Sequence, residues 1–100
     1  MVNMKVLFRM KQQLPEPELK NLLAQLVEVY KKVPGLKHKS FILDTKTGEV
    51  GGIYTFEDQG SLDTYLKSDV YKEVVVSNSQ GEPKVEIFNV IAATDAGVLL

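Results

Sequence analysis

Apolar and polar residues alternate along the first eleven positions of the chain. The even positions carry the apolar side chains Val2, Met4, Val6, Phe8 and Met10. A period of two residues is typical of a β-strand that buries one of its sides. The pattern therefore predicts a strand over residues 2–11 whose even-numbered side chains face the core.

The next segment has apolar residues at steps of three and four. These residues are Leu19, Leu22, Leu23, Leu26, Val29, Tyr30 and Val33. Such spacing places them along one side of an α-helix, which we expect over residues 16–32. Pro15 and Pro17 suit the start of a helix. Pro34-Gly35 ends it, because proline cannot continue the helical hydrogen bonds.

Two further stretches, residues 36–44 and 49–57, are rich in aromatic and β-branched side chains. This composition is typical of β-strands. The four residues between the stretches, Thr45 to Gly48, have the composition of a turn. The pattern predicts a β-hairpin.

The remainder of the chain predicts a short helix, an ambiguous segment and a last strand. Asp58 or Ser61 can cap the helix, whose inward residues are Leu62, Tyr65 and Leu66. Residues 70–77 fit a helix by their spacing and a strand by their consecutive valines, and we expect a helical turn there. Alternation over residues 84–92 predicts the last strand, and an apolar-ended tail follows over residues 93–100.

The predicted order is strand, helix, strand, strand, helix, strand. This is a ferredoxin-like βαββαβ arrangement of the α+β class, in which two helices cover one face of a four-stranded antiparallel sheet. The later strands carry apolar residues on both faces. Phe41 and Leu43 oppose Ile42, Ile53 opposes Tyr54 and Phe56, and Phe88 and Val90 oppose Ile87 and Ile91. Helices cover only one face, so we expect the other face to pack against a second copy in a homodimer.

Length, charge and composition narrow the function classes. One hundred residues suit a single domain over 1–100, and a net charge of -1 favours neither a nucleic-acid nor a membrane partner. The absence of cysteine and the single histidine argue against disulfides, iron–sulfur clusters and multi-histidine metal centres. With no signal peptide or membrane span in the pattern, we expect a cytoplasmic protein.

Several short segments resemble one known family. These segments are Pro34-Gly35, Gly51-Gly52-Ile53-Tyr54-Thr55-Phe56, Tyr65-Leu66 and Phe88-Asn89-Val90. They are similar to the YdhR-like mono-oxygenases of the dimeric α/β-barrel superfamily. The resemblance implies a homodimer with face-to-face sheets and a pocket between sheet and helices in each protomer. It also implies a hydrophobic or aromatic small-molecule ligand, which some related proteins oxidise with dioxygen and without metal, flavin or haem, so no cofactor is expected.

Two residues are candidates for catalysis. His38 has the only side chain whose ordinary pKa, about 6.5, lies near neutrality, and it is a candidate base for a phenol-like substrate. It stands between Lys37 and Lys39, a run that is equally typical of a solvated strand edge. Tyr54 lies in the matching motif, where its ring can stack on an aromatic ligand and its hydroxyl can donate a hydrogen bond. A buried structural tyrosine is the other interpretation.

Three residues are candidates for substrate binding. Tyr65 lies on the inward side of the second predicted helix, where a purely structural role is also common. The resemblance adds Phe41, in the strand where a relative carries tryptophan. Asn89 interrupts an apolar strand, and its amide can orient a ligand carbonyl or form a hydrogen bond across the dimer.

Other motif searches find nothing for competing functions. The chain has no phosphate-binding glycine loop before a helix, no serine-esterase motif, and neither the RNA-recognition nor the acylphosphatase signature. Two hypotheses remain. The first is a cofactor-independent mono-oxygenase acting on an aromatic, phenol-like molecule. The second is a non-catalytic dimeric domain that binds a hydrophobic small molecule or serves in assembly.

Overall fold

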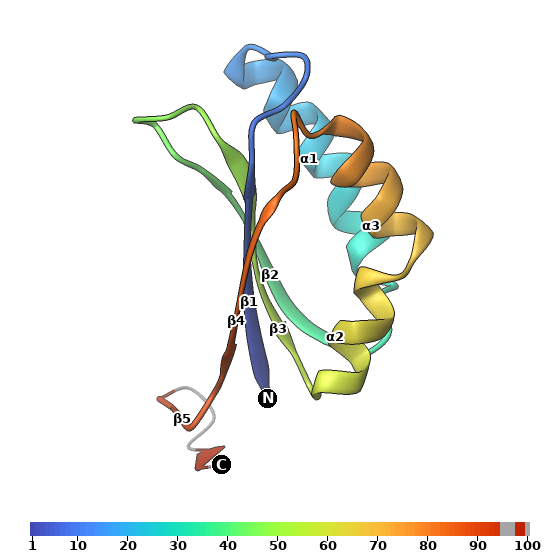
Figure 1. Cartoon of the computed structure of the whole chain (residues 1–100), viewed down its shortest axis with the longest axis vertical. Helices are drawn as coiled ribbons and strands as arrows, with labels where there is room; N and C mark the ends of the chain where they lie inside the picture. Colours follow the sequence, from blue (N-terminus) through green and yellow to red (C-terminus); the bar gives the residue numbers. More distant parts are fainter. Residues whose placement is uncertain (95–97, 100) are drawn as a thin grey trace.

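The structure is a computed structural model, and it describes residues 1–94 and 98–99 (Figure 1). The main elements are β1 (Val2–Phe8), α1 (Glu16–Tyr30), β2 (Leu36–Leu43), β3 (Val50–Phe56), α2 (Gln59–Leu66), α3 (Asp69–Val74) and β4 (Lys84–Asn89). A 3₁₀ turn, η1 (Val76–Asn78), follows α3, and a small hairpin pairs β5 (Ala92–Ala93) with β6 (Val98–Leu99).

Strands β1 to β4 form one antiparallel sheet with the order β2-β3-β1-β4. All three α-helices lie on one side of it, and the other side is open (Figure 1). This confirms the predicted ferredoxin-like fold. The short helix expected after Asp58 is α2, and the helical turn expected at 70–77 belongs to a separate helix, α3, because Ser68 caps α3 by accepting a hydrogen bond from the Tyr71 amide.

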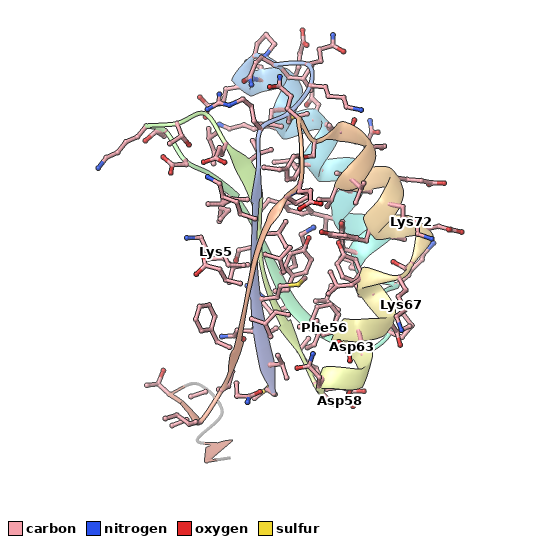
Figure 2. All side chains as sticks on the ribbon, in the orientation of Figure 1. Lys5, Phe56, Asp58, Asp63, Lys67 and Lys72 are labelled. Atoms are coloured by element: carbon pink, nitrogen blue, oxygen red, sulfur yellow. The ribbon has the colours of Figure 1, made fainter. Side chains whose placement is uncertain are left out.

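The register decides which side chains face the helices, since directly paired residues share one face of a sheet. One row across the sheet on the helix side consists of Lys39, Tyr54, Met4 and Ile87. A row on the open side consists of His38, Thr55, Asn3 and Phe88. Figure 2 shows the same division, with Phe56 between sheet and helices and Lys5 pointing away from the helices.

The predicted amphipathic pattern of α1 is confirmed, with Leu19 and Tyr30 buried against the sheet. Asp58 caps α2 by accepting a hydrogen bond from the Ser61 amide at 2.7 Å. The ambiguous residues 70–77 are helical because Tyr71 and Val75, four positions apart, both reach the core.

No helix in the described ranges is both long and apolar enough to cross a lipid bilayer.

The last strand is shorter than its alternation predicts. It ends at Asn89 rather than Ala92, and the Val90 amide then donates to the Met1 carbonyl at 3.0 Å. Ile91 is 75% exposed, so its place in the pattern does not reflect burial in the core. Part of the predicted tail, residues 95–97 and 100, lies outside the described residues.

Candidate functional site

A cavity of about 210 Å³ lies between the sheet and the helices. Its apolar lining includes Leu19, Leu22, Leu23 and Leu26 of α1, Phe41, Val50 and Tyr54 of the sheet, and Val74 of α3. The leucine stripe that predicted α1 therefore also makes one wall of the cavity. An enclosure of this kind desolvates a bound ligand and favours apolar or aromatic molecules.

Two consecutive glycines lie at or beside the cavity, Gly51 in its lining and Gly52 next to it along β3. A Cβ atom on Gly51 would collide with the backbone of Val6, so the strands approach closely there. A Cβ atom on Gly52 would lie 2.8 Å from Cε of Lys39. Gly52 thus leaves space for the Lys39 side chain on the helix side of the sheet.

The Lys39 amine is enclosed by aromatic rings. Its Nζ atom lies 3.1 Å from the ring centroid of Tyr30, 4.2 Å from that of Phe41 and 4.5 Å from that of Tyr54. Four lysines form ion pairs among the described residues, but Lys39 is not one of them. A partly buried amine without a carboxylate partner is unusual and is a mark of a functional site.

Burial lowers the pKa of the Lys39 ammonium to about 6, because the charged form loses its hydration. The ring faces oppose this effect, since each cation–π contact favours the ammonium by about 0.5–2 kcal/mol. The lowering corresponds to about 6 kcal/mol, of which the three ring contacts together offset about 1.5–6 kcal/mol. Lys39 therefore differs from an ordinary lysine, because burial favours its neutral amine, which accepts protons.

Three tyrosine hydroxyls meet behind the cavity wall. The Tyr65 hydroxyl lies 2.7 Å from the Tyr30 hydroxyl and 3.0 Å from the Tyr54 hydroxyl. Burial raises the pKa of all three phenols above the ordinary value. These groups stay protonated at neutral pH, so they donate hydrogen bonds and do not act as bases.

The structure brings three of the five sequence-predicted site residues together. Phe41 and Tyr54 line the cavity, and Tyr65 contacts Tyr54 with ring centroids 5.3 Å apart. Tyr30 completes the cluster through its ring contacts with Phe41 and Tyr65. The cluster therefore joins the aromatic wall of the cavity to the hydrophobic core behind it.

The other two predicted residues lie elsewhere. His38 belongs to the open-side row, is exposed, and places its Nε2 atom 3.0 Å from the Ser40 hydroxyl. It borders a separate open hollow at the β2 edge, beside Tyr30 and Phe41. Asn89 is exposed at the end of β4, opposite Val2. Neither side chain is part of the central cavity.

The sequence interpretation treated Lys39 only as a neighbour of His38. The signal that identifies it is period two along β2, because Lys39 lies two positions before Phe41 and so faces the same side. The alternation along an edge strand concealed this, since a lysine there is usually solvated.

The sequence of the chain matches a known protein family. The family model described as "Putative mono-oxygenase ydhR" matches residues 4–96. The chain belongs to this family. The match confirms the predicted resemblance and places both the cavity and Lys39 inside the matched region. No curated protein matches the chain.

Solved structures share the fold at low sequence identity. The NE2512 protein of unknown function from Nitrosomonas europaea is 18% identical, with a TM-score of 0.70 over 93% of this chain and 91% of that chain. The monooxygenase ActVA-Orf6 of Streptomyces coelicolor, in complex with nanaomycin D, is 18% identical, with a TM-score of 0.66 over 93% and 89%. A variant of SnoaB, a cofactor-independent oxygenase from Streptomyces nogalater, is 11% identical, with a TM-score of 0.65 over 92% and 94%. These similarities show that the chain has the same fold as these three proteins.

Proposed function

We propose that this protein is a cofactor-independent mono-oxygenase that acts on an aromatic, phenol-like small molecule in the central cavity. The observation that carries the proposal is an apolar, aromatic-lined cavity with a single unpaired amine at its wall. Membership of the mono-oxygenase family supports it, as does the fold shared with a cofactor-independent oxygenase.

The size of the cavity limits the substrate. Sites for drug-sized ligands have volumes of about 300–1,000 Å³. At about 210 Å³ the cavity suits a compound with one or two aromatic rings rather than a larger polycycle. Among phenols and their ring-fused analogues, the smaller ones are therefore the substrates to try first.

The reaction requires little of the protein beyond proton removal and desolvation. Loss of a proton from the substrate gives a carbanion that passes an electron to dioxygen, and the two then join through a new C–O bond. The peroxide anion takes back the proton removed in the first step, and the resulting hydroperoxide loses water to leave a carbonyl, so one oxygen atom enters the product and the other leaves as water. An apolar cavity protects the carbanion from reprotonation by solvent.

The residues divide between binding and proton transfer. The rings of Phe41 and Tyr54 contribute to the apolar wall against which the substrate ring packs. Tyr65 orients Tyr54 through their hydroxyl contact. His38 was the sequence-based candidate base, and its exposed position on the open side makes it the weaker candidate.

Oxygen consumption tests the proposal. A panel of one- and two-ring phenols is incubated with the protein, and dioxygen uptake and product mass are followed. We expect turnover that survives exhaustive chelation and needs no added flavin. Activity lost on chelation, or seen only with flavin, contradicts the cofactor-independent mechanism. Retention of a phenol without oxygen uptake favours the non-catalytic binding domain instead.

We propose further that the open side of the sheet forms a homodimer. Its apolar side chains include Ile53, 42% exposed, and Phe88, 54% exposed. An uncovered sheet face with such residues favours association, and stable interfaces bury about 1,600 Å². Light scattering at micromolar concentration is expected to give twice the mass of the 11.2 kDa chain. A monodisperse monomer contradicts the proposal.

A further inference from the structure

We propose that Lys39 is the proton acceptor of the cavity: its neutral amine takes the proton of a phenolic hydroxyl, and the resulting ammonium holds the phenolate. In this step the substrate O–H bond breaks and an N–H bond forms on Nζ, and no electron leaves either group. The inference rests on the proposed function for its substrate class and adds the catalytic residue.

The position of the amine supports this role. Lys39 borders both the central cavity and the outer hollow at the β2 edge, so its side chain lies where a ligand in the cavity can contact it. The aromatic rings of Tyr30, Phe41 and Tyr54 hold the amine within 4.5 Å of their centroids. Phe41 also lines the cavity, so a phenol in contact with its ring lies close to the amine.

The charge balance of the surroundings also supports it. Lys31 and Lys37, the other lysines at the outer hollow, pair with Glu28 at 3.0 Å and with Glu57 at 3.4 Å. Lys39 has no such partner in the part of the chain that the structure describes. An ammonium formed there lacks a counter-ion, and a phenolate supplies it.

The titratable groups near Lys39 come from every element packed against it. They are Tyr30 of α1 and Lys31 directly after it, Lys37 and His38 of β2, Tyr54 of β3 and Glu73 of α3. Burial holds both tyrosines in the protonated form, so they do not compete for the proton of the phenol. His38 and Glu73 are exposed, and solvent screens their charges.

Binding of 4-nitrophenol tests the inference without turnover, because its phenolate absorbs visible light and its phenol form does not. The probe is titrated with wild-type protein, with Lys39→Met and with Lys37→Met at a pH below the pKa of the free probe. Lys37→Met is the matched control, since Lys37 lies on the same strand and is exposed. A far-ultraviolet circular dichroism spectrum checks the fold of each variant.

We expect the bound probe to ionise in wild-type protein and in Lys37→Met but to stay protonated in Lys39→Met. A nearby opposite charge shifts a pKa by about 1–3 units, so the acid dissociation constant of the bound probe falls about tenfold or more in Lys39→Met. Ionisation that persists in Lys39→Met overturns the inference, as does binding of neutral probe by wild-type protein. Failure of every variant to bind the probe overturns it together with the phenol site.

The two proposals fail separately. Ionisation that depends on Lys39, without oxygen uptake for any phenol, refutes the mono-oxygenase and leaves the proton acceptor in place. Oxygen uptake that is equal in wild-type protein and Lys39→Met refutes the role of Lys39 and leaves the mono-oxygenase in place.

Discussion

Replacement of Lys39 by methionine is expected to remove a specific pH dependence of stability. Methionine keeps the length of the side chain among the rings of Tyr30, Phe41 and Tyr54 but cannot bind a proton. The folded chain holds the Lys39 pKa at about 6, whereas an unfolded lysine has a pKa of about 10.4. Between these values the unfolded chain binds one more proton than the folded chain, so stability rises with pH.

The magnitude follows from that single proton. The free energy of unfolding of the wild-type protein rises by about 1.4 kcal/mol per pH unit, or about 2.7 kcal/mol between pH 7 and pH 9. For a domain of this size, about 1 kcal/mol changes Tm by about 4–8 °C, so the expected rise is about 10–20 °C. Above pH 10 the effect reverses, because the raised pKa values of Tyr30, Tyr54 and Tyr65 make the unfolded chain lose protons first.

Urea unfolding at several pH values between 7 and 9 measures this dependence. Lys39→Met is expected to be the more stable protein at pH 7, by up to about 4 kcal/mol, and its advantage is expected to shrink by about 2.7 kcal/mol at pH 9. Lys37→Met serves again as the control and keeps the wild-type slope. A constant difference between wild-type protein and Lys39→Met across the range refutes a neutral, buried Lys39.

Three further substitutions test the packing around the site. Gly52→Ala places a methyl group 2.8 Å from Cε of Lys39, so we expect a loss of about 1–3 kcal/mol in urea unfolding and weaker ionisation of bound 4-nitrophenol. Tyr65→Phe deprives the Tyr30 and Tyr54 hydroxyls of their shared partner, with an expected loss of about 1–3 kcal/mol by thermal unfolding. Asp58→Ala removes the cap of α2 and lowers the urea midpoint at neutral pH. That difference disappears in acid, because the hydrogen bond to the Ser61 amide lowers the Asp58 pKa and its contribution ends once the folded carboxylate is protonated.

The sequence predicts those elements whose side chains divide cleanly between core and solvent. The alternation in β1 and the three-and-four spacing in α1 follow directly from burial of one side of each element. The end of β4 is not predictable in this way. Ile91 continues the apolar pattern beyond Asn89, yet it is exposed and lies outside β4. Apolar residues also occur at protein surfaces, so the pattern alone extends the predicted strand too far.

The candidate site is predictable only in its apolar part. Tyr54 and Tyr65 occupy inward positions of a strand and a helix, so the spacing of apolar residues in the sequence predicts that both are buried. Their hydroxyls are in contact in the core. His38 was selected for its ordinary pKa, which carries no information about the face on which it lies. The sequence gives no comparable signal for Lys39, because the ordinary pKa of lysine lies far from neutrality and only burial favours its neutral amine.

The stability of the chain bears on the role of Lys39. Methionine or leucine at this position would fill the space beside Gly52 without the cost of keeping an amine neutral, which is about 4 kcal/mol at pH 7. The free energy of unfolding of a folded protein is only about 5–15 kcal/mol, so a cost of this size is a large share of its stability. Costs of this kind are concentrated at functional sites, where a local departure from good packing serves binding or catalysis. The energetic argument and the geometric one therefore identify the same residue, Lys39, although each rests on a different property of the cavity.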